Sequence, residues 1–207
     1  MIPLLLFIAY LLGSIPTSVW IGRYFYNIDV REFGSGNAGA TNTFRVLGKA
    51  AGIPVLTIDI SKGALAVALA YLSGFAVGSD EFINLQLGLG VAALVGHIFP
   101  VFAGFRGGKG VATILGIVVC IVPIPCIYAL LIFLVVLFIS RIVSLSSMLA
   151  GIAFPIILNL VFGNTNPILT AFSVIVALLL IITHRRNIQR LLKKEEKKIR
   201  LFPSQKL

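Results

Sequence analysis

Long apolar runs alternate with short polar segments along most of the chain. Most of these runs approach or exceed the ~20 residues that an α-helix needs to cross a bilayer. They cover residues 2–22, 53–78, 82–104, 111–139, 142–163 and 168–183. The pattern predicts an all-α, polytopic integral membrane protein.

The run at residues 111–139 is the ambiguous one. A single helix of this length would rise about 44 Å at ~1.5 Å per residue, which exceeds a ~30 Å hydrocarbon core. Pro123 and Pro125 interrupt the run near its middle. We therefore expect two short helices joined by Pro123-Ile124-Pro125, and seven transmembrane helices in all.

Charge sets the expected orientation. The net charge is +10, with 17 basic and 7 acidic residues. With a hairpin at Pro123-Ile124-Pro125, the basic segments 23–49 and 106–109, Arg141 and the tail at about 185–207 all lie on one side. Loops rich in Lys and Arg face the cytoplasm. We therefore expect an outside N-terminus, a cytoplasmic C-terminus and one membrane-embedded domain over residues 1–207.

Composition narrows the function classes. The chain is 58% hydrophobic and 12% charged, and its mean hydropathy is +1.05. Its basic residues lie in short loops between apolar runs, where they favour membrane lipids and anionic substrates as partners, and not nucleic acid. Cys120 and Cys126 lie in apolar surroundings and predict neither a metal site nor a disulfide framework.

A polar, glycine-rich stretch at residues 33–49 separates the first two apolar runs. Glycines adopt backbone conformations that a side chain forbids, and successive amide N–H groups can then form a nest for an anion. The segment contains no acidic residue, which suits phosphate; the alternative is a flexible turn between helices. The candidate phosphate ligands are Gly34, Ser35, Gly36, Asn37, Gly39, Thr41, Asn42 and Arg45, with Lys49 as a further charge.

A second basic, glycine-rich loop follows the third apolar run. Gly107-Gly108-Lys109-Gly110 lacks the first glycine and the Ser/Thr of a P-loop. A lysine among glycines still offers a point charge beside bare backbone N–H groups, which suits phosphate. The alternative is that Arg106 and Lys109 are only topology signals.

Three further polar residues lie near the ends of apolar runs. Asp59 and Lys62 are one helical turn apart and can pair on one face. We interpret Asp59 as structural first and Lys62 as a possible phosphate contact. His97 has three possible roles: a general base, a phosphate partner, or a polar group satisfied between helices.

The expected topology places every polar cluster on the cytoplasmic side. The clusters are residues 34–49, Asp59 with Lys62, residues 97–113, and the serines at 144–147 with His184 and Asn187. We predict that they converge on one anion-binding pocket near the membrane surface.

Three motifs in order make the chain resemble a known family. Residues 34–42 read Gly-Ser-Gly-Asn-Ala-Gly-Ala-Thr-Asn, residues 96–102 and 107–113 read Gly-His-Ile-Phe-Pro-Val-Phe and Gly-Gly-Lys-Gly-Val-Ala-Thr, and residues 143–147 read Val-Ser-Leu-Ser-Ser. Together with His184-Arg-Arg-Asn187, they resemble the bacterial acyl-phosphate-dependent glycerol-3-phosphate acyltransferases over the length of the chain.

The resemblance implies a multi-pass protein of the bacterial inner membrane whose active site faces the cytoplasm. It implies transfer of an acyl group from acyl phosphate to the 1-hydroxyl of sn-glycerol 3-phosphate, which gives lysophosphatidate and phosphate. It implies no cofactor and no direct use of acyl-CoA. We also expect a monomer, and a soluble enzyme that produces acyl phosphate is a possible docking partner.

The family's catalytic and phosphate-binding positions can be carried onto this chain. Ser147 is chosen over Ser146 on alignment alone, and Arg106 stands where many members have lysine. The resemblance assigns catalytic roles to Ser35, Lys109, Ser147, His184 and Asn187, and substrate binding to Asn37, Thr41 and Arg45.

Acyl phosphate is already activated, so the enzyme mainly has to bind two phosphoryl groups and align the reactants. We hypothesise that a phosphate oxygen of the acyl phosphate accepts the hydroxyl proton. We also assign the nest at 34–39 to the acyl phosphate and Lys109 to glycerol 3-phosphate.

Two other function classes compete with this interpretation. A transporter of a phosphorylated or lipid anion would also have several helices and a basic pocket, but transporter sites usually lie near the midplane between repeats. A non-catalytic membrane scaffold would leave both glycine-rich loops unexplained.

Overall fold

The computed structural model describes residues 1–199, in which helices form the regular structure and no strand occurs. The chain folds as two compact units, Met1–Pro123 and Ile124–Leu207. Of the expected basic tail, the segment from Arg200 onward lies outside the described residues.

The first apolar run is not one helix. It forms α1 (Ile2–Gly13) and α2 (Thr17–Tyr26), whose axes differ in direction by 41°. Pro16 stands in the break, where it supplies no N–H group and disfavours a helical conformation at Ile15. The expectation of a continuous span over residues 2–22 is therefore wrong.

The segment expected to be a polar loop contains a helix of its own. A short 3₁₀ turn, η1 (Val30–Glu32), precedes α3 (Ala40–Leu47), and Gly48 separates α3 from α4. Gly48 has φ 81°, a left-handed conformation that glycine adopts without strain. The hydrophobic periodicity of eight residues is too short to stand out from the surrounding polar sequence.

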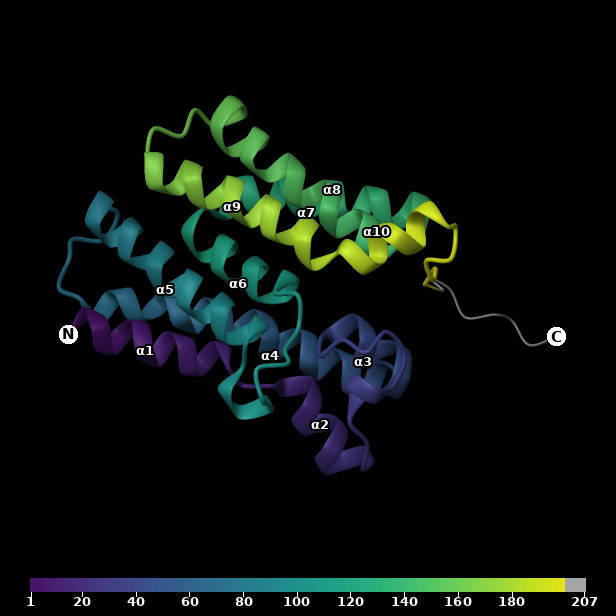
Figure 1. The fold of residues 1–207 in the computed structure, drawn as a ribbon. Helices are drawn as coiled ribbons and strands as arrows, with labels where there is room; N and C mark the ends of the chain where they lie inside the picture. The colour runs from purple at the N-terminus through teal and green to yellow at the C-terminus, as the bar shows by residue number, and fades with distance from the viewer. Residues whose placement is uncertain (200–207) are drawn as a thin grey trace. The chain divides into compact units, whose positions relative to one another are not determined.

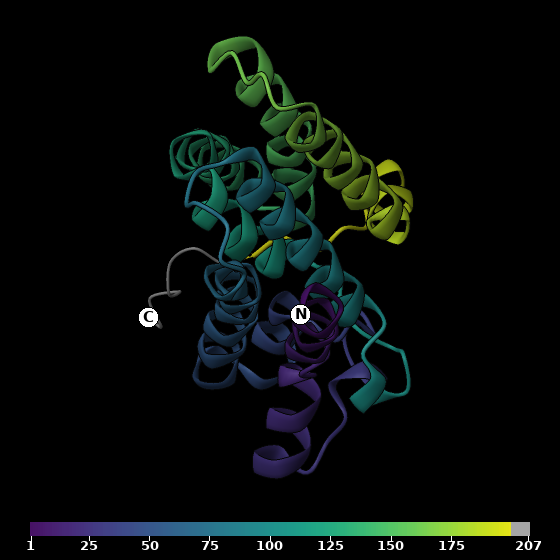
Figure 2. The same cartoon turned by 90° about the vertical axis from the view of Figure 1, so that its left-hand side faces the viewer.

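The rest of the first unit is a layer of closely packed helices. Figures 1 and 2 show α1 beside α5 and α4 beside α6. The elements are α4 (Lys49–Ala68), η2 (Leu69–Leu72), α5 (Asp80–Ile98), η3 (Val101–Ala103) and α6 (Val111–Ile121).

Glycines allow these helix pairs to approach at backbone distance. A Cβ atom at Gly13 would overlap the Ala93 carbonyl, and one at Gly116 would overlap the Ile60 carbonyl. Such small-residue contacts replace the hydrophobic effect as a source of helix association inside a membrane. Leu5, Ala66 and Phe82 belong to the buried cluster between α1, α4 and α5.

The second unit is an antiparallel helical group. Its elements are α7 (Pro123–Ser140), α8 (Val143–Ile156) with the π-helical turn η4 (Ile157–Val161), α9 (Pro167–Thr183) and α10 (Arg185–Leu192). The Asn166 side chain accepts hydrogen bonds from the N–H groups of Ile168 and Leu169 and so caps the start of α9.

A break within residues 111–139 is confirmed, because α6 ends at Ile121 and α7 begins at Pro123. The expectation that Pro123-Ile124-Pro125 joins the two helices is wrong, since Val122 separates them and the three residues belong to α7. The expectation that both helices are short is right for α6, with 11 residues, and wrong for α7, with 18. Pro123 and Pro125 lie in the first turn of α7, where proline is tolerated because no intrahelical N–H bond is lost.

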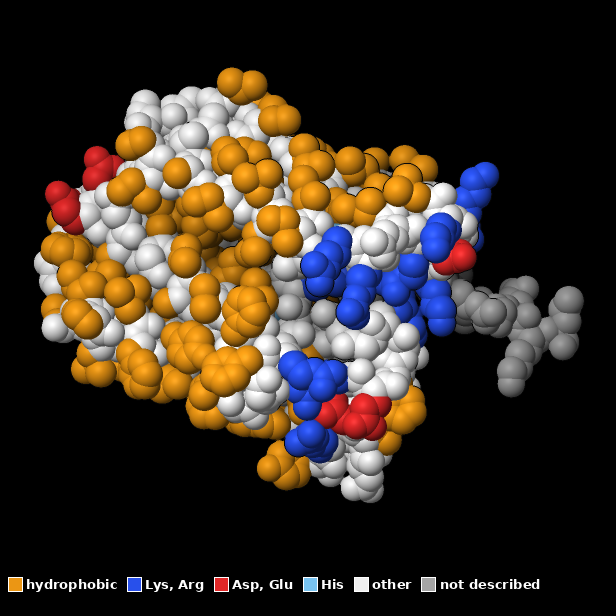
Figure 3. Space-filling model, in the orientation of Figure 1, with side chains coloured by type: hydrophobic (Ala, Val, Ile, Leu, Met, Phe, Trp, Pro, Cys, Tyr) orange, Lys and Arg blue, Asp and Glu red, His pale blue; other side chains and the backbone are white. Residues whose placement is uncertain are grey.

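Four helical segments are long and apolar enough to cross a membrane, and two bent pairs raise this to six candidates. The bent pairs are α1 with α2 and α9 with α10. Figure 3 shows hydrophobic side chains spread over the helices of both units, whereas Lys and Arg side chains gather near α2 in one unit and near α10 in the other. This surface suits contact with lipid along the helices and with water or headgroups at the basic segments.

Candidate active site

A buried ion pair lies beside the break between α1 and α2. The Lys62 Nζ atom is 2.9 Å from the Asp59 Oδ1 atom and donates a hydrogen bond to the Ile15 carbonyl at 3.0 Å. The Thr17 hydroxyl donates to the same Asp59 oxygen at 3.2 Å. The predicted pairing of Asp59 and Lys62 is confirmed. Lys62, which the sequence suggests as a phosphate contact, is only 3% exposed.

His97 lies next to this pair, near the end of α5. Its Nδ1 atom is 3.1 Å from the Thr113 hydroxyl and 3.8 Å from the Asp59 Oδ1 atom. Thr113 is in the first turn of α6, and both side chains are buried. Of the three roles that the sequence left open for His97, this geometry favours the polar group satisfied between helices.

The second glycine-rich loop lies directly on His97. The N–H groups of Gly107 and Gly108 donate to the carbonyls of Ile98 and His97 at 3.1 and 3.2 Å. A Cβ atom at Gly107 would overlap the His97 carbonyl, and one at Gly108 would overlap the His97 Nε2 atom. These two positions therefore require glycine for close packing, in addition to any role in ligand binding.

Of the three glycines at residues 34–39 in the first glycine-rich stretch, two have the left-handed conformations expected of an anion nest. Gly34 has φ 65° and Gly36 has φ 72°. Gly39 has φ −138°, which is ordinary extended backbone, and it immediately precedes α3. The expectation that all three adopt conformations forbidden to side chains is thus wrong for Gly39.

Asn42 holds this stretch together from inside. Its Nδ2 group donates to the carbonyls of Val30 and Phe33 at 2.8 and 3.1 Å. Its Oδ1 atom accepts from the Ser35 backbone N–H at 2.8 Å and from the Ser35 hydroxyl at 3.0 Å. Because Asn42 is 2% exposed, these bonds fix the shape of the loop and leave its amide turned away from solvent.

The two glycine-rich loops meet in the first unit. A Cβ atom at Gly108 would lie 3.0 Å from the Ala38 carbonyl of the first loop. Thr41 and Arg45 are exposed one turn apart on α3, and Asn37 and Lys109 are half-buried. The structure therefore brings the two loops into contact at Gly108 and Ala38, and the convergence of the predicted phosphate ligands on one site stays a prediction.

Arg31 and Asp29, which sequence reasoning missed, form a clamp that connects the segments leading into the two loops. The Arg31 Nη2 atom is 2.7 Å from the Asp29 Oδ2 atom, and its Nη1 atom donates to the carbonyls of Ala103 and Arg106 at 2.8 and 3.3 Å. The hydrogen bonds from Arg31 hold the pKa of the Asp29 carboxyl well below its usual range. The sequence offered only a basic residue in a basic loop, which is typical of a topology signal.

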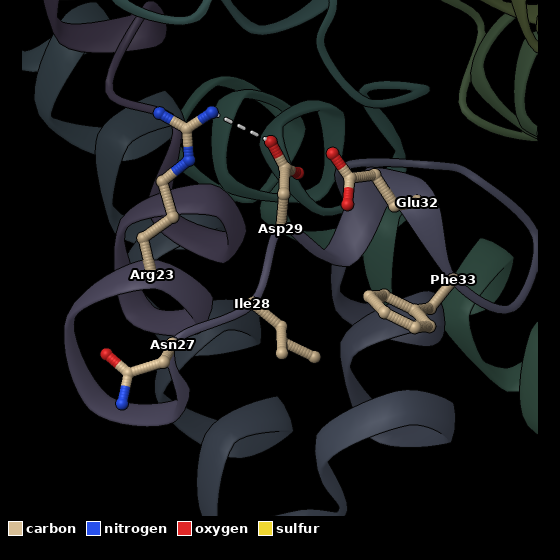
Figure 4. A pocket seen from close by; sticks show the side chains of 6 residues that line it. All are labelled: Arg23, Asn27, Ile28, Asp29, Glu32 and Phe33. Carbon is tan, nitrogen blue, oxygen red and sulfur yellow. Dashed lines mark hydrogen bonds and ion pairs between the residues drawn. The ribbon is translucent and has the colours of Figure 1, made fainter.

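An open pocket of about 470 Å³ lies beside this clamp. Figure 4 shows its lining, with the Arg23 side chain pointing toward Asp29 and with Glu32 next to Asp29. We do not place the phosphate site here, because the carboxylates of Asp29 and Glu32 would repel a phosphate.

In the second unit, Ser144 and Asn187 contact a carboxylate that sequence reasoning also missed. The Glu196 Oε1 atom accepts from the Ser144 hydroxyl at 2.9 Å and from the Asn187 Nδ2 group at 2.6 Å. Its Oε2 atom accepts from the Arg190 Nε group at 2.7 Å. Burial alone would raise the pKa of Glu196, but these hydrogen bonds outweigh burial and lower that pKa.

The other predicted residues of this unit are bound to their own helices. The hydroxyls of Ser146 and Ser147 donate to the carbonyls of Ile142 and Val143, each at 2.9 Å. The His184 Nδ1 atom is 2.8 Å from the Leu180 carbonyl. Ser147, His184 and Asn187 are all buried in this unit. The convergence of these residues with the two loops of the first unit on one pocket stays a prediction.

The role of Asn42 gives a testable prediction. In Asn42→Asp, one oxygen can still accept from Ser35, but the other faces the Val30 and Phe33 carbonyls and offers them no donor. We expect this variant to lose about 2 kcal/mol of stability, because buried carbonyls are left unpaired. Thermal unfolding of the purified protein measures the loss. Thr41→Ala, on the exposed side of the same helix, should unfold within a degree or two of the unmodified chain.

Comparison with known proteins places the chain in a family. The sequence profile described as "Glycerol-3-phosphate acyltransferase" matches residues 3–194. A glycerol-3-phosphate acyltransferase of Listeria monocytogenes is 47% identical, covering 95% of this chain and 96% of its own. One of Enterococcus faecalis is 46% identical, covering 92% of this chain and 88% of its own.

Two solved structures of the same family also match this chain. The crystal structure of PlsY (YgiH), an integral membrane glycerol 3-phosphate acyltransferase, in its glycerol 3-phosphate form matches with a TM-score of 0.86 and 37% identity over 96% of each chain. Its lysophosphatidic acid form matches with a TM-score of 0.82 and 36% identity, over 96% of this chain and 95% of that one. On this evidence, the chain belongs to the glycerol-3-phosphate acyltransferase family.

Proposed function

We propose that this protein transfers an acyl group from acyl phosphate to the 1-hydroxyl of sn-glycerol 3-phosphate, which yields 1-acyl-sn-glycerol 3-phosphate and phosphate. Family membership supports the acyltransferase reaction, and the related structures are named for glycerol 3-phosphate and for lysophosphatidic acid, a substrate and the product. The observation that carries the proposal is the meeting of two glycine-rich, basic loops over His97.

The reaction makes modest demands on the protein. The 1-hydroxyl oxygen attacks the acyl carbonyl carbon, the bond from that carbon to the phosphate oxygen breaks, and phosphate leaves with the electron pair. The hydroxyl proton passes to a phosphate oxygen of the donor, so no side-chain base is required. The protein has to bind two phosphoryl groups, align the hydroxyl with the carbonyl and stabilise the oxyanion.

The ligands divide between the two phosphoryl groups. The nest around Gly34 and Gly36 suits the acyl phosphate, and Lys109 with its neighbouring glycines suits glycerol 3-phosphate. Asn42 and Lys62 act indirectly, since their polar atoms bind the Val30, Phe33 and Ile15 carbonyls. The remaining substrate contacts are assigned to Ser35, Asn37, Thr41, Arg45, Ser147, His184 and Asn187.

The proposal includes a topology and a location. The six candidate spans and the short helix α6 make seven membrane-embedded segments, with the N-terminus outside and the C-terminus in the cytoplasm. Both units act as one acyltransferase domain in the inner membrane, as a monomer without a cofactor. The basic tail contacts anionic lipid, and a soluble enzyme producing acyl phosphate would meet this cytoplasmic face.

A choice of donors tests the reaction. The purified protein in lipid receives glycerol 3-phosphate with palmitoyl phosphate, palmitoyl-CoA or palmitoyl carrier protein, without added metal. We expect lysophosphatidate from palmitoyl phosphate alone. Product from a thioester alone would overturn the assigned donor, and no product from any donor with folded protein would overturn the reaction.

A transporter is the second candidate, and the broken helix favours it. The break between α1 and α2 lies beside a buried ion pair, as in many transporter sites. Against a transport site, the Lys62 ammonium already binds the Ile15 carbonyl in the break. Uptake of labelled glycerol 3-phosphate into sealed proteoliposomes without an acyl donor would support the transporter.

The assignment of Lys109 predicts a selective kinetic defect. Lys109→Ala should raise the KM for glycerol 3-phosphate by about tenfold or more, with a smaller change in the KM for acyl phosphate, because a charge-assisted contact to one phosphate is lost. Arg106→Ala, an exposed neighbour, is the matched control and should change either KM by less than about threefold. A selective change in acyl-phosphate saturation would reverse the assignment of the two phosphates.

A further inference from the structure

We infer that His97 is a positioning residue: its imidazole, held by Thr113 and the Asp59–Lys62 pair, supports the Gly107–Gly108 backbone and so sets the position of Lys109. The inference rests on the proposed function, because that function makes this loop a phosphate site.

The first step is the fixation of the ring. The Thr113 hydroxyl lies 3.1 Å from the His97 Nδ1 atom, and the Asp59 carboxylate lies 3.8 Å from the same atom. Asp59 is itself held by the Lys62 ammonium and by the Thr17 hydroxyl. One edge of the imidazole thus faces two buried polar side chains, Asp59 of α4 and Thr113 of α6.

The second step is the contact of the opposite edge with the loop. The His97 Nε2 atom occupies the place that a Cβ atom at Gly108 would need, and the backbone N–H of Gly108 donates to the His97 carbonyl at 3.2 Å. Ring and backbone of the same residue therefore both contact Gly108. The next residue along the chain is Lys109.

The third step concerns the first loop. The Ala38 carbonyl lies on the same side of Gly108, at 3.0 Å from the place of a Cβ atom. The Gly108 backbone therefore packs against both the His97 ring and the loop that carries Asn37. A shift of the ring would change the distance between the two phosphate-binding loops, which should weaken substrate binding before it affects the chemical step.

A double-mutant cycle tests this contact. His97→Ala removes the ring, and Gly108→Ala adds the methyl group that the ring excludes. In the double variant, the new methyl group enters the space that the ring has vacated. The kinetics are measured on the full chain in lipid nanodiscs with saturating palmitoyl phosphate and varied glycerol 3-phosphate.

We expect each single variant to raise the KM for glycerol 3-phosphate by about tenfold and to change kcat by less than about threefold. The double variant should be no worse than the worse single one. Effects that multiply to about a hundredfold would show that the two residues act independently and would overturn the inference. A loss of kcat at unchanged KM in His97→Ala would also overturn it, because His97 would then act on the reacting atoms.

If His97→Ala does not fold, a milder variant and its control test the positioning role of His97. Thr113→Val removes the hydroxyl that holds the ring and keeps the shape of the side chain. We expect a rise in the KM for glycerol 3-phosphate of about threefold, whereas Ser173→Ala, an equally buried hydroxyl on α9, should leave the KM unchanged. Equal values for the two variants would contradict the positioning role.

Failure of the proposed function has a different signature. In that case the unmodified chain makes no lysophosphatidate from any donor. For each variant of the double-mutant cycle, we then measure how much the unfolding temperature rises when inorganic phosphate is added. This rise reports phosphate binding to the loops without turnover. Coupling between positions 97 and 108 in this measurement would support the positioning role, and independent effects would refute it.

Discussion

Replacing Lys62 by methionine is expected to lower the stability of the folded chain by about 3–5 kcal/mol, because the variant leaves the buried Asp59 carboxylate without its cation. Asp59 and Lys62 are 2% and 3% exposed, so water cannot compensate for the lost ammonium group. The Ile15 carbonyl in the break between α1 and α2 also loses the hydrogen bond from the Lys62 Nζ atom. Thermal unfolding in detergent at a fixed scan rate measures the effect.

A double variant shows whether Lys62→Met loses stability because Asp59 is left as an unpaired charge or because the Lys62 side chain no longer packs. Asp59→Asn with Lys62→Met removes both charges, and this double variant should be clearly more stable than Lys62→Met alone. Lys49→Met, at the exposed start of the same helix, should unfold at the temperature of the unmodified chain. A double variant as unstable as Lys62→Met would show that the buried charge of Asp59 is not the cause of the loss.

Replacing Glu196 by alanine should lower the unfolding temperature and abolish most of the activity. The carboxylate accepts hydrogen bonds from Ser144, Asn187 and Arg190, and its side chain is 6% exposed. Hydrogen bonds to charged groups contribute about 1.5–3 kcal/mol each, and their donors would be left unpaired. Asn187, an assigned catalytic residue, would lose the acceptor that orients its amide. Glu195→Ala, the exposed neighbour, is the matched control.

The pH dependence provides an independent measurement. The pKa of Glu196 is lower in the folded chain than in the unfolded chain, so its stabilisation is fully present above the ordinary glutamate pKa of about 4.3. This stabilisation is lost as the pH falls through the lowered pKa. The difference in unfolding temperature between the unmodified chain and Glu196→Gln should therefore shrink on acidification below about pH 4. A difference that stays constant to about pH 3 would contradict the role of the charged carboxylate.

Local chemistry made some features of the fold predictable. The proline pair at 123 and 125 indicated a break between α6 and α7, although the prolines belong to the start of α7 and not to the junction, because proline is disfavoured in a helix interior but accepted in a first turn. The single Pro16 was not enough to predict the break between α1 and α2. A lone proline also occurs in continuous membrane helices, and α4 accommodates Pro54 in this way.

The sequence predicted which residues belong to the candidate site, but not which of them could contact a ligand and which only support the loops. The residues at 34–45 and 107–110 were proposed as phosphate ligands because glycine, hydroxyl, amide and basic groups without acidic neighbours suit an anion. Asn42 and Lys62 have the same chemistry as their neighbours in the sequence. Only their burial, and the carbonyls to which they donate, distinguish a supporting role from a ligand.

The amino-acid sequence by itself determined the helical membrane class, a break within residues 111–139 and the presence of two basic, glycine-rich loops. These follow from hydropathy, proline geometry and side-chain chemistry, which act over a few neighbouring residues. Only the tertiary structure showed that Glu196 accepts hydrogen bonds from Ser144 and Asn187, and that the His97 ring lies against Gly108. Such contacts join residues that are distant in the chain or on different elements, and they depend on how the helices pack.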